Sequence, residues 1–105
     1  ITITLDWDTE YTVATLNGTI AGLGTLDTGV TTKINCTPAL DYTVSELLAV
    51  LEGGLTQNVA TVELKYGTNF VDTDSSLHFT DTNKGSWSAI VTSGNGLVTT
   101  TYIFA

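Results

Sequence analysis

The sequence predicts a mainly β fold: an antiparallel β-sandwich or partly closed barrel of about seven strands, with one short amphipathic α-helix at residues 43–52. Three observations lead to this prediction. Short segments in which apolar and polar residues alternate recur along the chain, which is typical of half-buried strands. Turn residues separate these segments at close intervals, as in all-β domains. One segment alone has helical periodicity. The length is that of one domain, so we expect a single domain over residues 1–105.

The first predicted strand, residues 1–8, alternates without a break. Ile1, Ile3, Leu5 and Trp7 fall on one face, and threonine and aspartate fall on the other. A strand of this kind packs one face on a core and leaves the other in water, which is typical of antiparallel sheets.

Two further segments complete the predicted strands before the helix. Residues 11–16 form a less regular β segment that ends at an Asn-Gly turn. Residues 30–36 alternate and stop before a proline, which lacks a donor for the ladder. We expect the glycine-rich stretch between them, residues 19–29, to be a loop or an irregular edge.

The helix has the clearest local signals. Thr43 precedes Glu46 by three residues, which is the spacing of a capping box. An apolar stripe at positions i, i+3, i+4 and i+7 follows. It consists of Val44, Leu47, Leu48 and Leu51. Two glycines, Gly53 and Gly54, then stand where a left-handed C-cap is expected. A helix of this length is marginal alone, so we expect the stripe to lie on a sheet.

The C-terminal half returns to strands. Residues 60–66 alternate, and residues 77–79 and 87–91 flank a turn, so we expect these last two to form a hairpin. A glycine-rich turn then leads to residues 97–104, which are apolar on both faces and therefore predict a central strand. We expect that strand to pair directly with residues 87–91.

The composition is acidic and rich in threonine. Eleven Asp and Glu residues oppose three lysines and no arginine, for a formal net charge of −8, and 22 of the 105 residues are Thr. Such a chain repels a nucleic-acid backbone, and its apolar runs are far shorter than a membrane span, so we expect neither nucleic acid nor membrane insertion. The composition favours an extracellular or virion location. The lone Cys36 excludes an internal disulfide, and we expect no cofactor.

One short motif is typical of enzymes. The segment Thr25-Leu26-Asp27-Thr28-Gly29-Val30 resembles the active-site loop of aspartic proteases. The resemblance implies a homodimer in which two such loops bring two aspartates together to share a proton. The chain lacks the other parts of that family's pattern, which are a Gly-rich flap hairpin and an apolar-apolar-Gly segment followed by Arg or Asp before a late helix. The predicted helix also comes too soon after the motif. The alternative is that Asp27-Thr28-Gly29 forms a plain turn, and we favour it.

The only histidine, His78, alternates with apolar neighbours in a predicted strand. The sequence has no Gly-x-Ser-x-Gly elbow to accompany it, and one histidine with one cysteine is too few for a zinc site. We therefore expect His78 to be a strand residue that faces solvent.

Oxygen-bearing side chains indicate two kinds of surface site. Asp72, Asp74 and Asp81 crowd a predicted loop and turn, where we favour a solvated acidic face and give a weak calcium site as the alternative. Asn17 and Asn35 begin N-x-Thr triplets, which accept glycans in a secretory setting.

These observations favour a structural subunit over an enzyme. We expect a non-enzymatic β domain that assembles with itself in a virion component (tail, spike or decoration) or in an extracellular filament, by addition of a strand to a neighbour's sheet. The predicted assembly contacts are Ile1, Ile3, Leu5, Tyr102 and Phe104. The alternative is a module that binds a carbohydrate or another cell-surface ligand through exposed tyrosines and a calcium site. A homodimeric aspartic protease that uses the Asp27 motif is the less favoured alternative.

Overall fold

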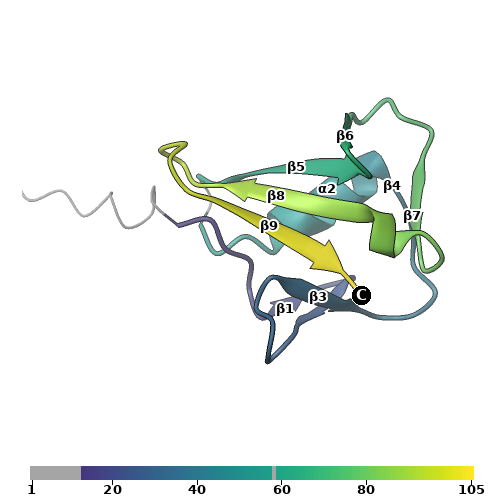
Figure 1. The fold of residues 1–105 in the computed structure, drawn as a ribbon, viewed down its shortest axis with the longest axis horizontal. Coiled ribbons are helices and arrows are strands. Elements are labelled where there is room, and N and C mark those ends of the chain that lie inside the picture. The colour runs from purple at the N-terminus through teal and green to yellow at the C-terminus, as the bar shows by residue number, and fades with distance from the viewer. Residues whose placement is uncertain (1–12, 58) are drawn as a thin grey trace, which may run out of the picture.

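The structure, a computed structural model, describes residues 13–57 and 59–105 (Figure 1). Within this part it is mainly β and contains one α-helix. The elements in chain order are β1 Thr19–Ile20, β2 Gly24–Leu26, β3 Lys33–Cys36, β4 Asp41–Thr43, α2 Val44–Gly53, β5 Thr61–Tyr66, β6 Asn69–Val71, β7 His78–Thr80, the 3-10 helix η1 Lys84–Ser86, β8 Trp87–Thr92 and β9 Thr99–Phe104. The predicted strand at residues 1–8 lies outside the described residues.

These elements form two layers. A seven-stranded sheet has the order β1-β2-β3-β9-β8-β5-β6, and β4 pairs with β7 in a two-stranded sheet. The helix α2 lies behind β5 and β8 in Figure 1 and contacts β5, β4, β1 and β7. Phe79 of β7 packs edge-on against Trp87 and Phe104 of the large sheet, with ring centroids 5.9 Å and 4.8 Å apart. The arrangement is sandwich-like, as the sequence predicts, and the large sheet is not closed into a barrel.

The sheet topology confirms one predicted pairing, corrects a second and shows that the sheet is mixed. β8 and β9 pair antiparallel, as expected. β9 is a central strand, but its other neighbour, β3, runs parallel to it, so the sheet is not wholly antiparallel. The predicted hairpin of residues 77–79 with 87–91 is wrong, because β7 pairs with β4 instead. The intervening residues form η1 rather than a tight hairpin turn.

The helix begins as predicted. The Thr43 hydroxyl accepts a hydrogen bond from the Glu46 N–H at 3.2 Å, and the Thr43 N–H donates to Glu46 Oε1 at 3.0 Å. Its end differs from the prediction, because Gly54 has a φ of −96° and is not left-handed. A Cβ on Gly54 would lie 3.0 Å from Cγ2 of Ile20, so a larger residue there requires the Ile20 side chain to shift.

The core lies between the two layers. Its largest fully buried side chains are Trp87, Tyr102 and Phe79. Three residues of the predicted helical stripe, Val44, Leu47 and Leu51, are fully buried too, and Leu48 is half-buried. No helix within the described residues is long and apolar enough to span a membrane.

Candidate functional site

Part of the β5–β6 edge of the large sheet is unpaired. β6 pairs only with the second half of β5, where Leu64 lies opposite Val71 and Tyr66 opposite Asn69. The first half of β5, Thr61–Glu63, pairs with β8 on one side and with no described strand on the other. An unpaired strand of this kind presents backbone N–H and C=O groups to a further strand. The opposite edge, β1, offers only two residues.

The chain itself explains why this edge stays open. After Val71 the backbone leaves the sheet, and the Ser75 N–H donates to the Asp72 carbonyl at 3.0 Å to make a turn. Aspartate is unfavourable in strands, so the sequence does not extend β6 past this point.

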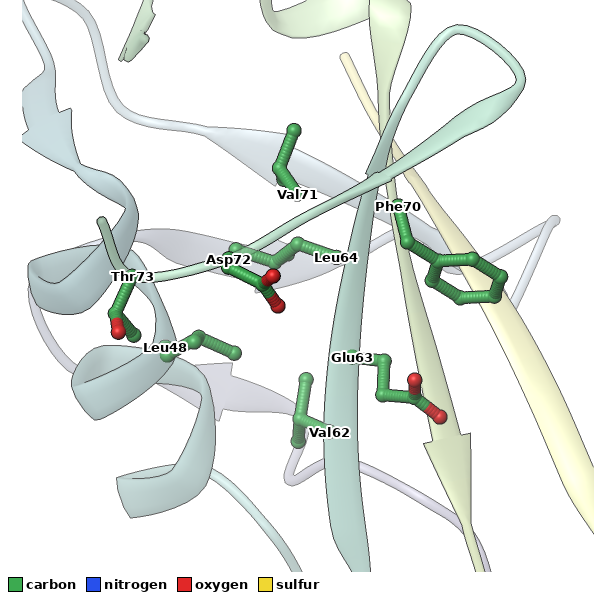
Figure 2. Close-up of a pocket in the computed structure, with 8 residues that line it drawn as sticks. All are labelled: Leu48, Val62, Glu63, Leu64, Phe70, Val71, Asp72 and Thr73. Atoms are coloured by element: carbon green, nitrogen blue, oxygen red, sulfur yellow. The ribbon is translucent and has the colours of Figure 1, made fainter. Parts of the chain in front are cut away.

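A hollow of about 180 Å³ lies at this open edge. Its lining consists of Leu48, Val62, Glu63, Leu64, Phe70, Val71, Asp72 and Thr73. Figure 2 shows Leu48 of α2 and Val62 of β5 on the same side of the strand, with Phe70 and Glu63 on its other side. Apolar side chains that face the helix layer therefore stand beside unpaired backbone, which is the combination that strand addition uses.

The structure corrects two of the predicted assembly contacts. Tyr102 and Phe104 are only 2% and 4% exposed, and both pack inside the chain. β9 alternates, so these residues point to the core while Thr101 and Ile103 point away from it. The predicted contacts Ile1, Ile3 and Leu5 lie outside the described residues.

The Asp27-Thr28-Gly29 motif forms a self-contained turn. Asp27 Oδ2 accepts hydrogen bonds from the N–H groups of Gly29 and Val30 at 2.9 and 2.8 Å. Its Oδ1 accepts from Asn35 Nδ2 at 3.0 Å. These bonds, that of Asn35 first, lower the pKa of Asp27 to about 2. The carboxylate thus holds its own loop, as in the plain-turn interpretation.

The predicted calcium site is not assembled. No group of three or more His, Cys, Asp or Glu side chains among residues 13–57 and 59–105 is placed to hold a metal ion, so Asp72, Asp74 and Asp81 do not converge. The Asp81 carboxylate instead accepts a hydrogen bond from the Ala39 N–H. The strand β7 lies between Asp74 and Asp81 in the chain, so Asp81 follows the far end of that strand.

The potential nucleophiles and bases are engaged elsewhere. His78 lies exposed on β7, as expected, with its Nδ1 2.6 Å from Asp41 Oδ1 on the paired strand β4. The Ser75 hydroxyl accepts a hydrogen bond from the Leu77 N–H at 3.2 Å. Partial burial raises the pKa of the Cys36 thiol.

The two glycosylation triplets differ in their surroundings. Asn17 and Asn35 are both exposed. The Asn35 side-chain amide donates to Asp27, whereas no such bond involves the Asn17 side chain in the described part of the chain. A glycan on Asn35 therefore competes with the turn at Asp27, and Asn17 is the more accessible acceptor.

The sequence analysis missed the residues of β6. Phe70 is 59% exposed, and Nζ of Lys65 lies 5.0 Å from its ring centroid. The signal was present, because an aromatic and a β-branched residue follow the turn at Gly67, which has a φ of +64°. The segment is only three residues long, and its role at the edge depends on the strand order.

Comparison of the chain with protein-family models, with curated proteins and with solved structures gave no match to any of them.

Proposed function

We propose that this chain is a non-enzymatic structural subunit that associates with copies of itself by strand addition. The observation that carries the proposal is the unpaired half of β5, Thr61–Glu63, which lies beside the hollow that Leu48 and Val62 help to line. The added strand is residues 1–7 of a neighbouring copy. Their sequence alternation offers Ile1, Ile3 and Leu5 to one face of a sheet.

Composition supports the setting of this assembly. Threonine is frequent and lysine is scarce, so we place the subunit on a virion or in an extracellular filament. The engagement of Asp27 in its own turn and the dispersal of the acidic side chains both favour a structural role over catalysis.

The added strand, residues 1–7, is tested with an apolar-to-acidic change and a matched control. Leu5→Asp removes an apolar side chain from the alternating face, whereas Thr4→Asp adds the same charge on the other face. We expect Leu5→Asp to leave a monomer in sedimentation velocity and Thr4→Asp to associate as the unchanged chain does. Equal association of both variants overturns the donor assignment.

The open edge of β5, which accepts the added strand, is tested with a second pair of variants. Leu48→Asp places a charge in the hollow, and Ala49→Asp places it on the exposed side of the same helix. We expect only Leu48→Asp to abolish association, with thermal unfolding used to confirm that both variants fold. A chain that is monomeric at every concentration overturns the proposed function as a whole.

A further inference from the structure

The chain contains two Asn-Gly pairs, Asn17-Gly18 and Asn95-Gly96. Such a pair can modify itself, because glycine has no Cβ and its backbone nitrogen can approach the preceding side-chain amide closely. Asn17-Gly18 precedes β1, and Asn95-Gly96 lies in the turn between β8 and β9 (Figure 1). Both asparagines are exposed, so exposure alone does not distinguish the two pairs.

Hydrogen bonds protect the Asn95 pair. Asn95 Oδ1 accepts from Ser93 Oγ at 2.7 Å and from the Leu97 N–H at 3.0 Å, so the side-chain amide is held in place. The Gly96 N–H donates to the Ser93 carbonyl at 2.9 Å. The backbone nitrogen of Gly96 must lose this bond before it can react with the Asn95 side chain.

The Asn17 pair has neither kind of protection. In the part of the chain that the structure describes, no hydrogen bond involves the Asn17 side chain or the Gly18 N–H. A Cβ built on Gly18 would have no described atom within 4 Å, apart from its chain neighbours. The reacting atoms of this pair therefore lie in open space that water can enter.

The backbone on either side of the Asn17 pair is anchored. The Asn17 N–H donates to the Gly54 carbonyl at 2.7 Å, and the Leu26 N–H donates to the Gly18 carbonyl at 2.9 Å. The first bond joins the pair to the end of α2, and the second joins it to β2. The pair is thus a short connection between two fixed points, with a side-chain amide that is free.

We infer that Asn17-Gly18 is a site of spontaneous deamidation and isomerisation, whereas the fold protects Asn95-Gly96. The Gly18 backbone nitrogen gives up its proton to solvent and bonds to Cγ of Asn17. The bond from Cγ to Nδ2 breaks, and the leaving nitrogen takes up a proton from solvent and departs as ammonia. Water then opens the resulting cyclic imide at either carbonyl. The products are aspartate and isoaspartate, in which the main chain runs through the former side chain.

Isoaspartate changes both the charge and the geometry of this corner. It adds a carboxylate to residues 11–26, a segment without any charged side chain. It also adds a carbon to the main chain between the bonds to Gly54 and Leu26, so we expect it to loosen β1 from α2. A glycan on Asn17 occupies the same side-chain nitrogen that deamidation removes, so each modification excludes the other.

Peptide mapping of a single sample measures both pairs. The purified chain is incubated in mildly alkaline buffer, digested and analysed by mass spectrometry for conversion of amide to carboxylic acid. We expect conversion at Asn17 to be several-fold faster than at Asn95 in the folded chain. In urea the two rates should become similar, because both pairs lose the surroundings that the fold provides. Equal rates in the folded chain, faster conversion at Asn95, or a difference that persists in urea overturns the inference.

Two variants separate the chemistry from its structural effect. Gly18→Ala places a Cβ beside the attacking nitrogen, at a position with open space and without a positive φ. We expect it to slow conversion at Asn17 several-fold and to leave the unfolding temperature nearly unchanged. A rate that Gly18→Ala does not change overturns the route through the cyclic imide.

Asn17→Asp supplies the new charge without the added main-chain carbon. We expect the aged chain, enriched in isoaspartate, to unfold at a lower temperature than this variant. Equal unfolding temperatures would show that isoaspartate does not loosen β1 from α2, even where the mass spectra confirm the modification.

Discussion

A single carboxylate, that of Asp27, organises the turn between β2 and β3. Its pKa falls from 3.8 to about 2 because Asn35, Val30 and Gly29 all donate to the ionised form. The unfolded chain therefore binds more protons in this range, and the stabilisation by Asp27 is complete above about pH 4 and is lost as the pH falls toward 2.

The variant Asp27→Asn tests this dependence. We expect it to lower the free energy of unfolding at neutral pH and to flatten the fall in stability between about pH 4 and pH 2, measured by urea unfolding. Asp74→Asn is the control, because hydrogen bonds to the Asp74 side chain are not found among the described residues. A pH profile that Asp27→Asn leaves unchanged contradicts the role of this turn.

Tyr102 acts within the chain rather than between chains. Its phenolic oxygen accepts a hydrogen bond from the Leu16 N–H at 3.0 Å, and the side chain is 2% exposed. Tyr102→Phe leaves that N–H without a partner, so we expect a loss of about 1–3 kcal/mol in the free energy of unfolding. Sedimentation of the folded variant should match that of the unchanged chain. Weaker association without loss of stability would restore Tyr102 as an assembly contact.

At the scale of elements, α2 depends on its capping box. Thr43→Ala removes the hydroxyl that accepts from the Glu46 N–H, and we expect it to cost about 1 kcal/mol of stability in urea unfolding. Ser45→Ala, on the exposed first turn, is the matched control and should change stability by less than about 0.5 kcal/mol. Equal effects of the two substitutions would show that the cap does not stabilise the helix.

Local signals explain which elements the sequence predicts. The helix is encoded within about ten residues by Thr43, Glu46 and the leucine stripe, and the β8–β9 pairing by the turn between them. No local signal encodes the parallel pairing of β3 with β9 or the antiparallel pairing of β4 with β7, because the partners in each pair are far apart in the sequence. Packing of the whole core selects them.

The candidate site at the β5 edge also depends on strand pairings between distant segments of the chain. Which strand lies at an edge follows from the strand order, so the open half of β5 could not be predicted from the alternation of residues 60–66. The misassigned contacts at Tyr102 and Phe104 reflect a different difficulty. Alternating Thr, Tyr, Ile and Phe does not say which face is buried, and the larger aromatic rings fill the core.

At the scale of the whole molecule, the proposed strand addition sets the direction of assembly. Strand addition at β5 extends the sheet in its own plane. Repetition of a contact between two different surfaces that does not close into a ring gives a single row of copies.

Net charge sets the conditions for such growth. Copies of charge −8 repel each other over about 30 Å at 0.01 M salt but over only about 8 Å at 0.15 M. Backbone hydrogen bonds and apolar contacts at the β5 edge are not screened in this way. We therefore expect association, measured by sedimentation velocity, to strengthen as sodium chloride rises through this range.

A change in charge separates this screening effect from a general effect of salt on solubility. Asp74→Asn reduces the net negative charge from 8 to 7 and is not among the residues that line the hollow, so we expect it to strengthen association at low salt and to have little effect at high salt. Association that weakens steadily with added salt would mean that attraction between unlike charges exceeds the repulsion between copies. The backbone and apolar contacts of the β5 edge would then contribute little to assembly.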